Sequence, residues 1–402
     1  MTASKRKKQK LRVAFKKNRE TRARVQNLTR KVDDAHEDEI EHLTGAERLS
    51  GKGSVNRYRT VIAEVDESSG DAILDVDVSK CLSGRVLSSI GTNNCRVQTD
   101  DAKEYQCSVR QVVRAIARDA RNAVVAGDRV LFTPSDDFTG AIERVEPRTT
   151  SLSRGSRRHA HIIVANVDQA VIVASANEPP LKPALIDRFL CSTEKGGIQG
   201  IVCINKIDLG SAVDLQPLVG QYAQLGYPVV LTNALTGEGI STLRRYLEGR
   251  ETVFTGQSGV GKSSLLNAIQ PGLGRPTMEI SGDTNKGRHT TRVTELIPLR
   301  SHVPSAGSSE HGGWVVDTPG IRQLQLWDVQ SEEVEGLFIE FRPFVAHCKF
   351  PNCSHTHEHD CGVKRGVDNG MISPLRYESY LRIVEGDEES LFSLADWRKR
   401  KL

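Results

Sequence analysis

This sequence of 402 residues lacks the features that mark membrane, secreted and repeat proteins. No apolar run approaches the ~20 residues that a membrane helix needs, so we expect no membrane contact. The basic N-terminus is followed by no apolar core, which argues against a secretory signal. No internal repeat is present. We therefore expect a cytoplasmic, monomeric protein with two to four domains of ~100–200 residues each.

The cysteines do not form the pattern of a disulfide framework. Three of the eight, Cys348, Cys353 and Cys361, cluster near the C-terminus, and the other five are scattered. This distribution fits a reducing compartment and a single metal site.

Charge is distributed unevenly along the chain. Residues 1–31 contain 13 Lys or Arg and a single acid, Glu20, whereas residues 32–41 contain six acids and no base. The net charge is only +4, so the remainder is nearly neutral. A basic tail favours contact with a polyanion, most often nucleic acid, although a solvated extension would look the same. We expect residues 1–54 to be a disordered or transiently helical tail.

The apolar pattern then predicts a multidomain fold of the α/β plus β class. Short alternating runs between Tyr58 and Val145, separated by turn signals, predict an OB-type β-barrel over residues 55–147. Apolar strands that alternate with helices predict a parallel sheet covered on both faces over residues 148–335. Residues 336–402 are expected to form a zinc-binding helical domain with a basic C-terminus. The strands expected in the sheet are 170–174, 201–205, 228–231, 252–255 and 314–316, and the helices are 185–193, 215–225, 240–247 and 262–269.

The strongest motif is the phosphate-binding pattern G-x-x-x-x-G-K-[ST] at residues 256–263. It lies between an expected strand and an expected helix, where backbone N–H groups and a helix N-terminus can surround phosphates. Lys262 should reach the β- and γ-phosphates as a catalytic group, and Ser263 should ligate Mg²⁺. A chance glycine-rich turn is the alternative, which this context disfavours. The residues expected to contact nucleotide are Gly256, Gln257, Ser258, Gly259, Val260, Gly261, Lys262, Ser263 and Ser264.

Two further motifs accompany it. Asp317-Thr-Pro-Gly320 follows an apolar strand, so Asp317 could serve the metal and the Gly320 N–H could meet the γ-phosphate. Asn205-Lys206-Ile-Asp208 follows another strand and matches the N-K-x-D pattern by which GTPases read guanine. The Asp208 carboxylate can accept the guanine N1–H and 2-amino hydrogens, a pair that adenine lacks. Taken singly, each could be an ordinary turn or helix cap.

The order of these motifs indicates a circular permutation, because N-K-x-D precedes the phosphate loop instead of following it. Between the phosphate loop and Asp317 lies Gly-Arg-His-Thr290-Thr291, where one threonine should close on Mg²⁺ when the γ-phosphate is present. An ordinary polar loop is the alternative there.

A fourth pattern is Cys348-x₄-Cys353-x-His355-x₅-Cys361. Three thiolates and an imidazole make a closed tetrahedral zinc site, which predicts a structural rather than a catalytic ion. His357 and His359 compete for the fourth position. Free surface cysteines are the alternative.

Together these motifs closely resemble the RsgA (YjeQ) family of circularly permuted GTPases of small ribosomal subunit biogenesis. The resemblance covers about residues 55–385 and includes all four motifs. It implies an OB barrel, a permuted GTPase and a zinc domain, which bind the small ribosomal subunit and its rRNA late in assembly. GTP would be hydrolysed to GDP with turnover stimulated by the subunit. Ile321 stands where Ras-like enzymes carry a glutamine, so the resemblance makes His289 the candidate for orienting water.

One departure concerns the loop that supports guanine. The family usually has Ser-Ala there, whereas this chain has Asn233-Ala234. Backbone contacts could survive this change, but the side-chain support is open to question. Two other functions stay open: a GTP-binding, RNA-associated scaffold without significant hydrolysis, and a GTP-dependent metallochaperone with exchangeable metal.

Overall fold

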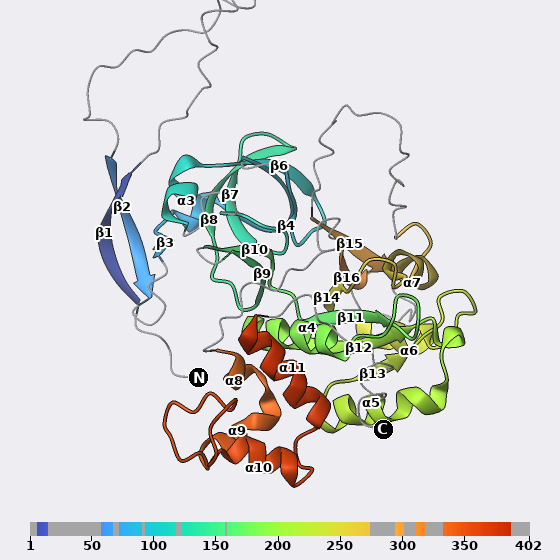
Figure 1. The fold of residues 1–402 in the computed structure, drawn as a ribbon. Helices are drawn as coiled ribbons and strands as arrows, with labels where there is room; N and C mark the ends of the chain where they lie inside the picture. Colours follow the sequence, from blue (N-terminus) through green and yellow to red (C-terminus); the bar gives the residue numbers. More distant parts are fainter. Residues whose placement is uncertain are drawn as a thin grey trace, which may run out of the picture.

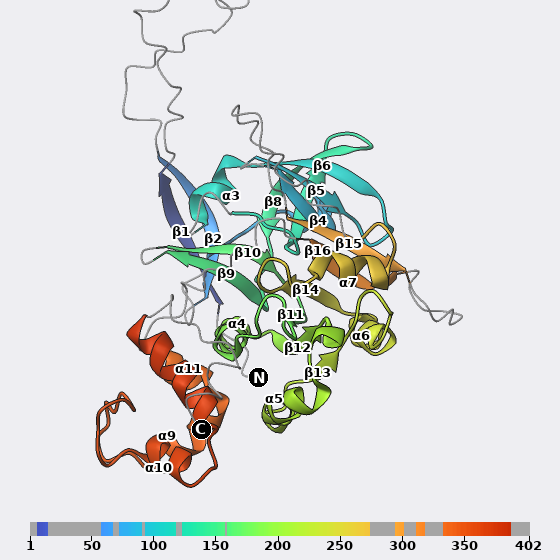
Figure 2. The ribbon, with the colours of Figure 1, turned by 45° about the vertical axis from the view of Figure 1, so that its right-hand side comes forward.

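The computed structural model describes residues 6–14, 58–66, 72–90, 93–117, 123–156, 159–273, 294–300, 311–317 and 333–386. Figures 1 and 2 show a β-barrel beside a sheet that is covered by helices, with a small helical domain packed below the sheet. The domain boundaries expected from the sequence remain a prediction.

The barrel closes from five strands in the order β4-β5-β6-β8-β7, with β7 pairing back to β4. All pairs are antiparallel except β6 with β8. One helix, α3, connects β6 to β7, and this connectivity is that of an OB fold. The elements are β4 (Leu82–Ile90), β5 (Asn94–Gln98), β6 (Glu104–Val109), α3 (Gln111–Ile116), β7 (Arg129–Pro134) and β8 (Thr139–Val145), preceded by the 3₁₀ turn η3 (Val78–Lys80). The OB-type barrel expected from the sequence is therefore confirmed.

Alternating side chains fill the barrel. Along β6 every second residue is buried, and Tyr105 and Cys107 pack with Val97, Phe132 and Ile142 in one apolar cluster. Strand β6 was not predicted, because glutamate, glutamine and serine occupy its outward positions. The apolar residues Tyr105 and Cys107 stand two positions apart, and this alternation is the signal that could have predicted the strand.

A separate sheet of three strands, in the order β1-β2-β3, stands at the side of the barrel (Figure 1). Its strands are β1 (Arg6–Ala14), β2 (Tyr58–Asp66) and β3 (Ala72–Leu74). The expectation of a disordered or transiently helical N-terminus is therefore wrong for Arg6–Ala14. The strand pairs with β2 in an unbroken antiparallel register, which supplies the partner that a lysine-rich strand cannot supply by itself. Residues 15–54 of the expected tail lie outside the described residues.

The second sheet has the order β13-β12-β11-β14-β16-β15 and is parallel except for β15. Its strands are β11 (Gln169–Ser175), β12 (Gln199–Asn205), β13 (Val229–Leu231), β14 (Glu251–Thr255), β15 (Glu295–Arg300) and β16 (His311–Asp317). The five parallel strands expected from the sequence are confirmed, whereas β15, an antiparallel strand that contains a proline, was missed. A hairpin of β9 (Ser151–Ser156) and β10 (His159–Ala165) leads from the barrel into this sheet.

Helices cover both faces of the second sheet. They are α4 (Pro183–Gly196), α5 (Ala212–Gln224), α6 (Ile240–Leu247) and α7 (Lys262–Ile269), and all four were expected. Ile172 and Val202 point into the cluster that contains residues of α4 and α5. Val171 and Ile201, one position away, point into the cluster with α6 and α7. Continuous apolar strands of this kind are typical of parallel sheets that are buried on both sides.

Strand pairing and ion pairs join the barrel to this sheet. Glu295 of β15 pairs with Ser88 of β4, which makes one continuous run of eleven strands. Arg85 of β4 forms an ion pair with Glu251 at the start of β14, and its guanidinium lies 5.6 Å from the ring centroid of Trp314 in β16. The barrel therefore contacts three neighbouring strands of the sheet, including the strands that lead to residue 256 and to residue 317.

The C-terminal domain consists of short helices around one apolar cluster. They are α8 (Val334–Leu337), the 3₁₀ turn η6 (Ile339–Phe341), α9 (Arg342–Val345), α10 (Gly362–Asp368) and α11 (Pro374–Glu385). Helix α8 and the turn η6 are separated at Phe338, whose backbone is extended. Cys191 of α4 belongs to the same buried cluster, so the domain is packed on the sheet domain through α4.

A buried ion network fixes that packing. Arg376 of α11, 1% exposed, donates to Asp187 of α4 at 2.8 Å and to both carboxylate oxygens of Glu340 at 2.6 and 3.0 Å. Tyr222 of α5 donates to the same oxygen of Asp187 at 2.7 Å, and the guanidinium of Arg376 lies 4.4 Å from the ring centroid of Phe338.

Within the described part of the chain, no helix is both long and apolar enough to cross a membrane.

Candidate nucleotide site and metal cluster

Three of the loops singled out in the sequence meet at one edge of the parallel sheet. The phosphate-loop motif follows β14, N-K-x-D follows β12, and Asn233-Ala234 follows β13. These are the carboxyl ends of parallel strands, where open α/β sheets bind their ligands. Asp317 ends β16 at the same edge, although its side chain is not among those described. Gly320, His289, Thr290 and Thr291 lie outside the described residues.

All three glycines of the phosphate-loop motif have a positive φ, and two of them also leave no room for a β-carbon. Gly256 has φ +139° and Gly261 has φ +93°. A β-carbon on Gly256 would lie 2.1 Å from the carbonyl oxygen of Val173, and one on Gly261 would lie 2.4 Å from the side chain of Asn205. Any larger residue would therefore force the loop away from β11 or from the N-K-x-D segment.

Lys262 is the first residue of α7, and its ammonium group bends back across the loop. It donates to the carbonyl oxygens of Gly256 and Gln257 at 2.7 and 2.6 Å. Val260 is buried in the core, whereas Ser258 and Gly259 are exposed at the loop surface. Ser263 is half-buried and Ser264 exposed in the first turn of the helix. A cation held over a loop that opens a helix is suited to an anion such as a phosphate chain.

Asn205 connects the three loops. Its amide donates to the carbonyl oxygen of Val260 in the phosphate loop at 2.9 Å. Its carbonyl oxygen accepts hydrogen bonds from the Thr232 hydroxyl at 3.2 Å and from the Ala234 N–H at 3.3 Å. Because this side chain is 1% exposed, it holds the loops together without facing a ligand.

The other two members of N-K-x-D face outward. Lys206 has left-handed backbone geometry, with φ +58°, and its ammonium donates to the carbonyl oxygen of Glu178 at 2.7 Å. Asp208 lies in the 3₁₀ turn η4 (Ile207–Leu209), and it is exposed. Its carboxylate is therefore available for hydrogen bonding at the rim of the site.

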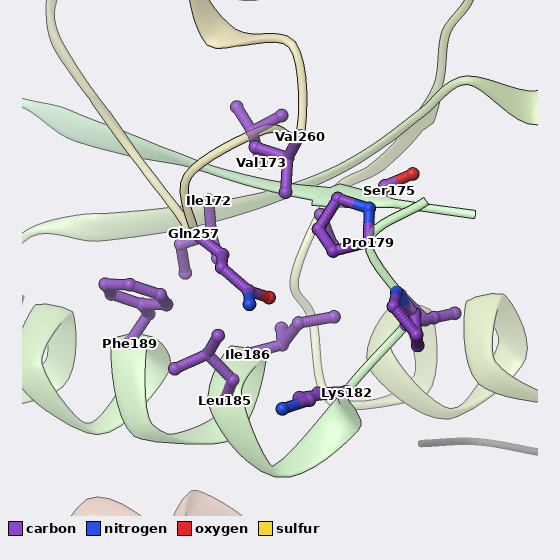
Figure 3. A pocket seen from close by; sticks show the side chains of 13 residues that line it. Ile172, Val173, Ser175, Pro179, Lys182, Leu185, Ile186, Phe189, Gln257 and Val260 are labelled. Carbon is purple, nitrogen blue, oxygen red and sulfur yellow. The ribbon is translucent and has the colours of Figure 1, made fainter. Parts of the chain in front are cut away.

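A small apolar pocket lies on the α4 side of the phosphate loop (Figure 3). Gln257 reaches from the loop toward Leu185 and Ile186 of α4, and Phe189 closes one side. The free volume of the pocket is about 10 Å³, far below the ~300–1,000 Å³ usual for ligand sites, and neither Lys262 nor Asp208 lines it. We regard it as a packing gap that separates the phosphate loop from α4.

The four metal-ligand candidates come together in the C-terminal domain. One ligand atom from each of Cys348, Cys353, His355 and Cys361 lies within 4.8 Å of the others. Nδ1 of His355 lies 3.5 Å from Sγ of Cys348 and 3.3 Å from Sγ of Cys361. These spacings fit a tetrahedral ion, because a Zn–N bond of ~2.0 Å and a Zn–S bond of ~2.3 Å place the nitrogen and the sulfur ~3.5 Å apart. His357, with a side chain 84% exposed, is not part of the cluster.

Surrounding groups prepare this cluster for a cation. Backbone N–H groups of Gly362 and Lys364 donate to the sulfurs of Cys348 and Cys361 at 3.3 and 3.4 Å. Such donors favour thiolates, whereas burial raises the pKa of Cys353 to about 12 and favours the thiol until a cation is bound. Nε2 of His355 lies 3.3 Å from a carboxylate oxygen of Glu335, the usual second partner of a metal-bound histidine. Glu335 was not predicted, because its spacing from the ligands follows no metal-site pattern.

Comparison with known proteins agrees with this arrangement. A family model described as RsgA GTPase matches residues 145–327. The small ribosomal subunit biogenesis GTPase RsgA of Bacteroides fragilis is 37% identical over 306 residues, which are 75% of this chain and 96% of the relative. The protein of the same name from Gemmatimonas aurantiaca is 40% identical over 292 residues, which are 71% of this chain and 92% of the relative.

Two solved structures are also similar. The crystal structure of YjeQ from Thermotoga maritima has a TM-score of 0.60 at 35% identity, and the match covers 76% of this chain and 98% of that chain. The structure of YloQ, described as a circularly permuted GTPase, has a TM-score of 0.56 at 30% identity and covers 76% and 94%. About a quarter of this chain lies outside each match.

Proposed function

Because this chain belongs to the RsgA family of GTPases, we propose that it hydrolyses GTP on the small ribosomal subunit during late subunit maturation. The relatives are named for the biogenesis of that subunit. The observation that carries the proposal most directly is the contact of Asn205 with the carbonyl of Val260 at 2.9 Å. It joins a guanine-recognition loop to a phosphate loop at one sheet edge, although the two motifs occur in permuted order along the chain.

One group of residues is assigned to the guanine base and another to the phosphates of GTP. Asp208 accepts the guanine N1–H and 2-amino hydrogens, while Lys206 covers the base with its stem. Lys262 and the N–H groups of residues 256–263 bind the β- and γ-phosphates and stabilise the charge that develops on them. Ser263 and Asp317, with Thr290 or Thr291, are the residues that would hold Mg²⁺, which neutralises phosphate charge when bound.

Orientation of the attacking water is assigned to His289 on family resemblance alone, since Ile321 replaces the glutamine of Ras-like enzymes. A His289→Ala variant should therefore keep its affinity for GTP while losing turnover. Loss of affinity without loss of turnover at saturating GTP would contradict this role.

The Cys348, Cys353, His355 and Cys361 cluster is proposed to bind one structural Zn²⁺. Three sulfurs and one nitrogen complete a tetrahedral shell and leave no position for a substrate. Cys361 and His355 are fully buried, Cys353 is 6% exposed and Cys348 is half-buried, so most of the ligand set is closed to solvent and metal exchange is expected to require the domain to open. This burial disfavours the metallochaperone, which needs an accessible ion.

The function is tested by cosedimentation of the full chain with purified ribosomal subunits. The complex with a non-hydrolysable GTP analogue should pellet with small subunits, and the GDP complex should pellet less. Equal binding to large subunits would contradict the assignment. Binding that does not depend on the nucleotide would favour the scaffold.

The basic strand β1 is proposed to contact rRNA. Lys8 and Lys10 are exposed, and Arg12 occupies a position on the same face of the outer strand. Lys8 is already paired with Asp75 at 2.8 Å, so Lys10 is the better candidate for phosphate contact, and Arg12 is proposed with it because the two positions alternate onto one face of the strand. Raising the salt from about 50 to 200 mM weakens binding to the subunit. This fold-loss of affinity should be about ten times smaller in a variant that lacks two phosphate contacts. The Lys10→Gln/Arg12→Gln variant tests this in the sedimentation assay, with Lys8→Gln as the control.

A charge-preserving variant tests whether the strand itself matters. Leu11→Pro/Ala14→Pro places prolines at positions of opposite parity, so at least one removes an N–H that faces β2. We expect affinity for the subunit to fall several-fold although no charge is lost. Wild-type affinity in this variant would mean that a flexible tail is sufficient.

A further inference from the structure

Asn233 makes a contact that bears on the choice of base. This residue follows β13 and is 4% exposed, and its side-chain amide donates to Oδ1 of Asp208 at 2.9 Å. Resting on the proposed GTPase function, we propose that Asn233 is a positioning residue for guanine specificity. It does not touch the base, and it acts by fixing the carboxylate of Asp208.

The orientation of the Asn233 amide is determined by its surroundings. Its carbonyl oxygen accepts the backbone N–H groups of Leu235 at 2.9 Å and Thr236 at 3.3 Å. An amide turned the other way would place its NH₂ against two donors, so the NH₂ group must face Asp208. The backbone of Asn233 is held as well, because its N–H donates to Glu238 and its carbonyl accepts from Gly237, both at 2.9 Å.

The contact with Asn233 leaves the Asp208 carboxylate with enough acceptor positions for guanine. An ionised carboxylate offers about four acceptor positions, and the buried amide of Asn233 occupies one of them on Oδ1. The other oxygen is free to accept one hydrogen of guanine while Oδ1 accepts the second. A carboxylate that rotates freely would lose part of this bidentate match, since both hydrogens must be met at once.

Asn233 replaces the serine that the family usually has, and its longer side chain reaches the carboxylate of Asp208. A serine hydroxyl is shorter and donates and accepts through one oxygen, whereas the Asn233 amide accepts two backbone N–H groups through its oxygen and donates to Asp208 through its nitrogen. The single residue Asn233 links the loop 233–238 to N-K-x-D, whereas Asn205 links both loops to the phosphate loop.

A purely structural role is the competing explanation, because Asn233 also closes its own loop. The two explanations differ in their effect on related bases. Guanine presents both N1–H and a 2-amino group, whereas hypoxanthine presents only N1–H. A loosened loop would weaken GDP and inosine diphosphate alike, but a misoriented carboxylate would weaken GDP more.

The test is equilibrium binding of GDP and inosine diphosphate to full-length protein. For Asn233→Ala we expect GDP affinity to fall about ten-fold, as for the loss of a hydrogen bond to a charged group. Inosine diphosphate should lose clearly less, so the preference for GDP shrinks. Asn233→Asp, which puts a second carboxylate beside Asp208, should bind GDP more weakly than Asn233→Ala.

A matched control is Asn166→Ala. Asn166 also ties a loop, accepting from the N–H of Thr149 at 2.9 Å and donating to the Gly127 carbonyl at 3.1 Å, but it lies outside the nucleotide site. It should lower thermal stability without changing the preference for GDP. Equal losses for the two nucleotides in Asn233→Ala, or an undiminished effect of Asn233→Ala in an Asp208→Ala background, would overturn the proposal. If the wild type showed no preference for GDP over ADP, the proposed function itself would have failed instead.

Discussion

Replacement of Lys262 by alanine should lower the rate of GTP hydrolysis at saturating GTP by about 100- to 1,000-fold, the usual effect of losing one preorganised transition-state donor. The ammonium is already held over the phosphate loop by the carbonyl oxygens of Gly256 and Gln257, at 2.7 and 2.6 Å. Little reorganisation is then needed when phosphates replace those contacts. Single-turnover hydrolysis measures the effect separately from product release.

Lys182 provides a matched control for this substitution. It caps α4 and lines the apolar pocket beside the phosphate loop, but it does not point to the carbonyl groups that Lys262 contacts. Lys182→Ala should hydrolyse GTP at close to the wild-type rate. A Lys262→Ala enzyme with near wild-type turnover would show that phosphates are bound elsewhere, and the assignment of this loop would be wrong.

Replacement of Cys361 by serine should release the metal and unfold the C-terminal domain. Cys361 is fully buried in the same cluster as Phe338, Phe341 and Val363, so the metal ligand is also a core residue. In small metal domains the energy of metal binding is folding energy, of the order of 10 kcal/mol. Metal analysis should fall from one zinc per chain to none, and limited proteolysis should cleave within residues 333–386.

His357→Ala is the control, because His357 lies in the same loop but has a side chain that is 84% exposed. It should keep its zinc and its resistance to protease. A Cys361→Ser protein that retains one zinc per chain, or a His357→Ala protein that loses it, would contradict the ligand set. Unfolding of this domain would also leave Asp187 of α4 without Arg376, so the sheet domain should lose stability as well.

The parts of the fold that the sequence predicted well are those with local signals. Apolar runs on the five parallel strands are nearly continuous because both faces are buried, and turn residues mark their ends. The OB barrel followed from alternation, and β6 was missed only because its outward residues are polar. The phosphate-loop and N-K-x-D residues lie at one edge of the sheet in the described part of the chain, and the four metal-ligand candidates form one cluster.

The parts that were missed depend on partners far away in the sequence. Arg6–Ala14 has a composition typical of a solvated tail, and its strand exists through pairing with β2. Asp187 and Arg376 are 189 residues apart, and no pattern predicts that pair. The role of Asn233 could not be derived from Ser-Ala alone, since it depends on the 2.9 Å contact with Asp208. Likewise, only geometry separated His355 from His357 as the fourth ligand.

The most direct test of the central claim is the rate of GTP hydrolysis by the purified chain, measured alone, with small ribosomal subunits and with large subunits. We predict slow turnover alone, strong stimulation by small subunits and none by large subunits. If neither subunit stimulates hydrolysis, or both do so equally, the role on the small subunit is contradicted, although the nucleotide site would stand.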